Sequence, residues 1–282
     1  MVGEDGWPVL QSYRGILLDR VSFGYNGVTV LEDICLDIRE GEFLSLLGPS
    51  GSGKSTMLRL IAGIETPSGG RIVCRGKAVT GPGADRGMVF QDYSLFPWMN
   101  LTENIALAIS RINKTKSRRE HRTLADEYLE MVGLAGLGRK YPFELSGGMQ
   151  QRVAIARALA LGSGFLLMDE PFGALDPINR ARLQDLLIEI WSCSEPAKTV
   201  VFVTHDMDEA LYLGDRVVII GSLPGRIIGK IDVNFQRPRS RKAYLTMPEL
   251  QLLRTSVLEL LRQHAIERLQ TDDTISSQSE GI

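Results

Sequence analysis

With 282 residues, of which 44% are hydrophobic and 23% charged, the chain has the composition of an ordinary globular protein of one large domain or two modest ones. Its net charge of −2 lacks the basic excess typical of nucleic-acid-binding domains, so we expect no nucleic-acid partner. No apolar run approaches the ~20 residues that span a bilayer, no leader indicates a signal peptide, and three scattered cysteines without metal-ligand spacing indicate buried free thiols in a reducing cytosol.

The first third of the chain has short strand patterns and one clear helix pattern. Residues 1–14 mix Gly, Pro and polar residues, and we expect them to form a flexible lead. Residues 55–63 have helical spacing and end on Gly63, a favoured residue just past a helix. Short apolar or alternating runs predict four strands, at residues 34–39, 42–48, 71–74 and 88–90.

The remainder continues the alternation of helix and strand. A polar interval at residues 113–122 is interpreted as a solvated face between two helices. Asp176 and Pro177 are suited to the start of another helix, and Asp206 with Glu209 resembles a capping box. The remaining predicted elements are helices at residues 102–110 and 123–132 and strands at residues 165–168 and 199–205.

Strands that alternate with helices predict an α/β domain with a mostly parallel sheet. Interruptions around residues 75–87 and 100–145 indicate an added β piece and an inserted helical piece. The expected organisation is a domain over residues 15–240 with a helical subdomain at about 92–160, a C-terminal helical extension at 241–268 and a disordered tail at 269–282.

A glycine-rich run over residues 48–56, GPSGSGKST, fits the pattern G-x-x-x-x-G-K-[ST] between a predicted strand and a predicted helix. Its glycines let the backbone N–H groups face phosphate oxygens. In such a loop Lys54 binds the β- and γ-phosphates, and the Ser55 hydroxyl binds Mg²⁺. We therefore predict a nucleotide site formed by Gly48, Pro49, Ser50, Gly51, Ser52, Gly53, Lys54, Ser55 and Thr56.

Polar side chains at three predicted strand ends complete this site. Asp169 and Glu170 follow one buried strand, His205 ends a second, and Gln91 follows a third. Parallel strands deliver such residues to the sheet edge where the phosphate loop lies. We expect Asp169 to hold Mg²⁺, Glu170 to polarise an attacking water, and His205 to donate to the γ-phosphate. The Gln91 amide is expected to reach Mg²⁺ or the attacking water.

A second glycine turn occurs in residues 145–159, LSGGMQQRVAIARAL. Ser146, Gly147 and Gly148 precede apolar residues at helical spacing, so they begin a helix whose first turn carries almost no side chains. Such a turn exposes backbone N–H groups and the positive end of the helix dipole. It predicts a second anion-binding position in the same chain.

Taken in order, GPSGSGKST, the strand-ending Gln91, LSGGMQQR, FLLMDEP, GALD and VTH resemble the ATPase subunit of an ABC transporter, over about residues 15–232. The resemblance implies a P-loop NTPase core, ATP and Mg²⁺ as ligands, and a head-to-tail dimer with a second copy. In that dimer Ser146–Gly148 contact the γ-phosphate of an ATP held by the other chain's Lys54 loop. Whether a homologous second chain replaces the identical copy stays open.

The same resemblance assigns two further residues. Tyr25 stacks on adenine, with a core-facing strand position as the alternative, and Asp176 both caps its helix and touches the partner's phosphate loop. Met149 stands where glutamine is commonest, and Ala174 replaces a common serine. The Met149 departure concerns a side-chain contact to the ribose, and the Ala174 departure concerns one hydrogen bond across the dimer.

Because the chain shows no spanning segment, the resemblance implies a separate integral-membrane permease and a position on the cytoplasmic face of the plasma membrane. A docking groove for a permease helix is expected at Leu95, Phe96, Pro97 and Trp98. The alternative is that these residues form a small core of the helical subdomain. The runs at 82–98 and 236–241 resemble the nitrate, sulfonate and taurine importers, which also use a substrate-binding protein. Alternatives are an importer for another solute class and a soluble ABC ATPase without a transport role.

Overall fold

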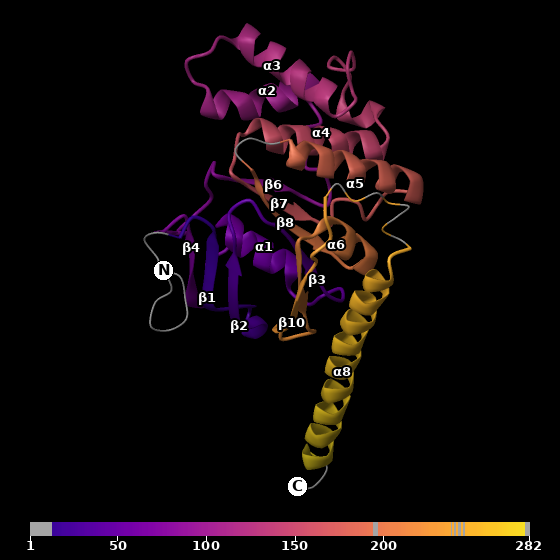
Figure 1. The fold of residues 1–282 in the computed structure, drawn as a ribbon. Helices are drawn as coiled ribbons and strands as arrows, with labels where there is room; N and C mark the ends of the chain where they lie inside the picture. The colour runs from indigo at the N-terminus through magenta and orange to yellow at the C-terminus, as the bar shows by residue number, and fades with distance from the viewer. Residues whose placement is uncertain are drawn as a thin grey trace.

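The computed structural model describes residues 13–193, 197–237, 239, 241, 244 and 246–279. Two sheets form the body of the molecule (Figure 1). The larger has the order β10-β9-β3-β8-β7-β6, and its strands run parallel except for β10. Its strands are β10 (Ile227–Asp232), β9 (Arg216–Ile220), β3 (Phe43–Leu47), β8 (Thr199–Thr204), β7 (Phe165–Asp169) and β6 (Arg86–Val89).

The smaller sheet is antiparallel, with the order β2-β1-β4-β5. Its strands are β1 (Ile16–Tyr25), β2 (Val28–Ile38), β4 (Gly69–Cys74) and β5 (Lys77–Ala78). The prediction of an added β piece around residues 75–87 is therefore wrong in extent, because most of this sheet comes from the N-terminal hairpin. Alternation over residues 34–39 identified only the end of β2, since a bulged and twisted hairpin blurs the period of two.

The helices occupy different parts of the molecule. In Figure 1, α2, α3 and α4 lie together at one end of the molecule, while α8 extends away from it on the opposite side. The bounds are α1 (Lys54–Ala62), α2 (Leu101–Ile112), α3 (Arg118–Met131), α4 (Gly147–Ala160), α5 (Pro177–Ser192), α6 (Met207–Leu213) and α8 (Pro248–Ser279), with a 3-10 turn, η1, at Pro142–Glu144.

The central strands are covered on both faces, which explains why their sequences read as continuous apolar runs. Along β3, Leu44 and Leu46 pack into the core shared with α1 and the antiparallel sheet, whereas Phe43 and Leu47 pack into the core shared with α4, α5 and α6. A third core joins α2, α3 and α4. The mostly parallel sheet with an antiparallel subdomain and inserted helices agrees with the predicted fold class.

Three local expectations need correction. Helix α3 begins at Arg118, inside the polar interval predicted as a solvated face, because Ser117 and Glu120 form a capping box there. Helix α8 continues to Ser279 and so occupies most of the tail expected to be disordered, since extending an existing helix avoids the cost of nucleation. The three cysteines are free, as expected, but only Cys74 is buried. The domain boundaries remain predictions.

Candidate nucleotide site

The phosphate loop joins β3 to α1 at the carboxyl end of the sheet. Gly51 and Gly53 have φ angles of 79° and 88°, in the left-handed region that favours glycine. Gly48 lies so close to β9 that a Cβ there would be 2.4 Å from the carbonyl oxygen of Ile220. The glycine spacing in the sequence thus reflects two residues with left-handed backbone conformation and one close approach to a neighbouring strand. Helix α1 begins at Lys54, directly after Gly53.

Lys54 is buried, with 4% of its surface exposed, and its ammonium points back into the loop. Nζ donates to the carbonyl oxygens of Gly48 at 2.8 Å and Pro49 at 2.7 Å. Burial lowers the pKa of Lys54, and the neighbouring charges of Glu170 and Asp169 oppose that shift. The ammonium is thereby held where phosphates would meet the loop.

The end of β7 brings a carboxylate to the first turn of α1. The Ser55 hydroxyl donates to Asp169 Oδ1 at 2.7 Å, so two oxygen ligands predicted from segments 114 residues apart do meet. Burial raises the pKa of Asp169, and the hydrogen bond from Ser55 opposes the shift. The two side chains form an oxygen-rich pair beside the loop, the type of donor set that Mg²⁺ prefers.

Glu170 and His205 meet at the ends of the adjacent parallel strands β7 and β8. His205 Nδ1 lies 3.0 Å from Glu170 Oε2. Glu170 has φ of 42°, which is uncommon for a residue with a side chain, and its backbone N–H donates to the carbonyl oxygen of Val203. This conformation turns the carboxylate out of the strand and toward the imidazole.

Gln91 and Tyr25 lie at the margins of the arrangement. Gln91 is exposed in the turn after β6, and β6 pairs with β7, so Gln91 follows a strand that ends beside Asp169. Tyr25 ends β1 with 39% of its surface exposed, and its ring packs edge-on against buried Phe23. Of the two strand positions, Phe23 faces the core, whereas Tyr25 keeps an accessible ring.

The second glycine turn packs against different residues from those that contact the phosphate loop. Ser146 precedes α4 and makes no side-chain cap hydrogen bond. A Cβ on Gly147 would approach the Tyr93 hydroxyl to 3.1 Å, and one on Gly148 would approach Leu175 to 3.6 Å. The turn therefore packs on the loop before α5, whereas the phosphate loop packs on β9.

Asp176 caps α5, as predicted. Its carboxylate accepts from the N–H groups of Ile178 and Asn179, both at 3.1 Å, and these hydrogen bonds hold its pKa below the usual range. A contact of Asp176 with a partner's phosphate loop stays a prediction.

Sequence reasoning missed a buried network directly behind His205. Thr204, the last residue of β8, donates to Glu209 on α6, and Gln184 on α5 donates to the other oxygen of Glu209. The expected capping box is half present: Asp206 accepts from the N–H groups of Asp208 and Glu209, but the Glu209 carboxylate binds Thr204 and Gln184 instead of the Asp206 N–H. The adjacency of Thr204 to His205 was the one signal that could have indicated this network.

A phosphate loop after a buried parallel strand, with acids and a histidine at neighbouring strand ends, defines the class of P-loop nucleotide-binding ATPases. A model of the family described as "ABC transporter" matches residues 31–173. Among curated relatives, the nitrate import ATP-binding protein NrtC of Synechococcus elongatus is 50% identical over 83% of this chain and 35% of its own length. NrtD of the same organism is 46% identical over 82% of this chain and 84% of its own length.

The bicarbonate transport ATP-binding protein CmpC of Synechococcus elongatus is 47% identical over 85% of this chain and 36% of its own length. The chain thus spans only about a third of NrtC and CmpC. A solved dimeric structure of the ATP-binding cassette MJ0796 with ADP and Pi superposes with a TM-score of 0.69 at 34% identity, covering 78% of this chain and all of the other. The chain belongs to the ABC transporter family, as an ATP-binding cassette.

Proposed function

We propose that this chain is the ATP-hydrolysing subunit of an importer and energises the uptake of a small anion. The observation that carries the proposal is the convergence of Lys54, Ser55–Asp169 and Glu170–His205 at one sheet edge. A phosphate-binding loop alone would support nucleotide binding. The adjoining carboxylate and imidazole add the groups that hydrolysis requires.

The chain's own residues have separate tasks in this proposal. The loop N–H groups and Lys54 bind the phosphates and stabilise negative charge that develops on them. Glu170 orients the attacking water, and His205, held by Glu170 at 3.0 Å, donates to the γ-phosphate. Ser55 and Asp169, with Gln91, would hold Mg²⁺, which supplies charge neutralisation at the phosphate oxygens.

A head-to-tail dimer explains why one chain has two anion-binding turns. Ser146–Gly148 pack beside Leu175, and the phosphate loop packs beside Ile220, so each turn has its own surroundings. The solved MJ0796 cassettes are described as dimeric, including a post-hydrolysis state with ADP and Pi. In the proposed dimer each ATP lies between one chain's Lys54 and the other's Ser146–Gly148, with Tyr25 on the adenine.

The helical subdomain offers a surface for the permease. Trp98 is 70% exposed, and the centroid of its ring lies 5.6 Å from that of the Phe96 ring. Phe143 is 75% exposed, and its ring stacks on that of Tyr141. Backbone hydrogen bonds from Leu101 and Thr102 to residues 140 and 138 bring these two loops together. Within the described residues, no helix has both the length and the apolar character needed to cross a bilayer. An aromatic surface of this kind suits a helix of an integral-membrane partner at the cytoplasmic face.

Relatives named for nitrate import and for bicarbonate transport make an inorganic anion the first candidate solute, with aliphatic sulfonates and taurine retained. The test is uptake by cells that lack this gene and carry either the wild-type chain or Lys54→Ala, supplied separately with nitrate, bicarbonate, taurine and an alkanesulfonate. We expect wild-type cells to recover uptake of one of these anions and the variant to recover none. Equal uptake with both chains would refute an ATP-driven import role.

A further inference from the structure

A continuous set of hydrogen bonds connects the end of β8 to α6, α5 and the segment before α8. It begins at Thr204, directly before His205. The Thr204 hydroxyl accepts from the backbone N–H of Asp206 at 3.0 Å and donates to Glu209 Oε2. These bonds secure the backbone on both sides of His205, and none of them involves a residue of the phosphate loop.

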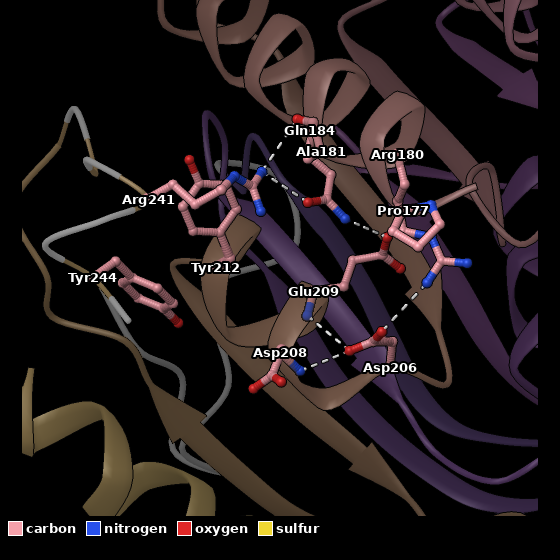
Figure 2. A pocket seen from close by; sticks show the side chains of 10 residues that line it. All are labelled: Pro177, Arg180, Ala181, Gln184, Asp206, Asp208, Glu209, Tyr212, Arg241 and Tyr244. Carbon is pink, nitrogen blue, oxygen red and sulfur yellow. Dashed lines mark hydrogen bonds and ion pairs between the residues drawn. The ribbon is translucent and has the colours of Figure 1, made fainter. Parts of the chain in front are cut away.

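Glu209 is the centre of the set. It is 7% exposed, and its second oxygen, Oε1, accepts from Gln184 Nε2 at 2.7 Å (Figure 2). Gln184, itself buried on α5, uses its carbonyl oxygen Oε1 to accept from Arg241 Nη2 at 2.9 Å. The guanidinium of Arg241 also lies over the Tyr212 ring, 4.3 Å from its centroid.

Each hydrogen bond in this set has one assignable donor and one assignable acceptor. Arg241 can only donate, so Gln184 must present its oxygen to Arg241 and its amide nitrogen to Glu209. Glu209 therefore accepts at both oxygens, from Gln184 and from Thr204. The side-chain polar atoms of Thr204, Glu209 and Gln184 all have partners, whereas Arg241 Nε is buried without one among the described residues. A buried network whose groups are paired holds its geometry firmly, and one mismatched group disturbs the whole.

We propose that Glu209 is a positioning residue for the Glu170–His205 pair, acting through Thr204, and that Gln184 and Arg241 fix its orientation. The inference rests on the proposed hydrolysis of ATP, because the pair it positions is assigned to that reaction. The Glu209 carboxylate bonds Thr204 and Gln184 and no residue of the phosphate loop, so we expect its effect to fall on turnover and to leave ATP binding unchanged.

The direction of the hydrogen bonds supplies a test that a purely structural role would not pass. Glu209→Gln places an amide group against either the Gln184 amide or the Thr204 hydroxyl. Gln184→Glu places two carboxylates against each other. In the double variant Glu209→Gln/Gln184→Glu, the new amide donates to the new carboxylate, which still accepts from Arg241, and the Thr204 hydroxyl regains its acceptor. The net charge equals that of the wild type.

Steady-state ATP hydrolysis is measured for the wild type, both single variants, the double variant and Tyr212→Phe. The last is the matched control, because it keeps the ring under Arg241 and removes a hydroxyl that bonds none of Thr204, Glu209 and Gln184. Asp185, which accepts from that hydroxyl, keeps its bond from Arg241. We expect each single variant to lose about ten- to a hundredfold in kcat with little change in KM, and the double variant and the control to stay within about threefold of wild type.

A second readout does not depend on hydrolysis. The His205 imidazole resonances, assigned by comparison with His205→Gln, should shift in each single variant and return in the double variant. A wild type that hydrolyses no ATP would contradict the proposed function, and these resonances would still test the positioning role. Unchanged kcat and resonances in Glu209→Gln, or a double variant no better than the single ones, would overturn the inference.

Discussion

Replacing Glu170 with glutamine changes one oxygen to nitrogen at the point where the proposed chemistry occurs. Glu170 Oε2 lies 3.0 Å from His205 Nδ1, and an amide can pair with either tautomer of that ring. The left-handed backbone at residue 170 accommodates glutamine as it does glutamate. The variant should therefore keep the site's shape and lose only the carboxylate that polarises water.

The expected loss in kcat is about a hundred- to a thousandfold, equivalent to about 3 to 4 kcal/mol of transition-state stabilisation. ATP affinity should stay near that of the wild type, because Lys54 and the loop N–H groups bind the phosphates. With hydrolysis blocked, ATP should hold two chains together, so the 31.2 kDa chain should elute at twice that mass, about 62 kDa.

The assay combines ATP turnover, calorimetry and gel filtration with and without ATP and Mg²⁺. Glu130→Gln, an exposed acid on α3, is the control and should behave as the wild type. Turnover of Glu170→Gln at the wild-type rate would refute the assigned role of Glu170. A monomer of Glu170→Gln under saturating ATP would refute the shared site between two chains.

Three further variants test the site and its supports. Lys54→Ala should lose most ATP binding by calorimetry, since it removes the buried ammonium of the loop, and an unchanged Kd would contradict this. Asp169→Asn should unfold at a higher urea concentration than the wild type at pH 7, and this gain in stability should shrink toward pH 4. Burial raises the pKa of Asp169 in the folded state above its unfolded-state value of about 3.9. The wild type therefore loses stability as the pH rises from about 3.9 through the folded-state pKa, whereas asparagine does not titrate. No gain at pH 7 would contradict it. Arg216→Met leaves Glu42 buried without its ion pair and should lower the free energy of unfolding by about 3 to 5 kcal/mol, and a loss below about 1 kcal/mol would contradict the buried-pair argument.

The sequence predicted the parts of the site that depend on local pattern and on the edge rule for parallel strands. Lys54 lies in a loop whose glycine spacing is typical of a phosphate loop, and Asp169 ends a strand whose carboxyl end lies at the same edge. The contact of Ser55 with Asp169 followed from those two facts, although 114 residues separate them. The fold class followed for the same reason, from alternating strands and helices.

Other features depend on partners that no local pattern reveals. Glu209 matched a capping box in sequence, but two better-placed partners, Thr204 and Gln184, take its carboxylate in the folded chain. The start of α3 was missed because ten polar residues have no apolar period, and only the pairing of Ser117 with Glu120 sets it. Cys193 is exposed because it lies at the C-terminal end of α5, a position that amino-acid composition cannot predict.

The bonds from Lys54 to Gly48 and Pro49 have a consequence for how tightly any phosphate is held. An arriving anion exchanges places with two carbonyl oxygens, so the ammonium is never left bare and the net gain is the difference between two good partners. A departing product meets the same exchange in reverse, with the loop's own backbone ready to take over. This exchange reduces the net free energy that binds a phosphate, as suits a site that must bind and release nucleotide repeatedly.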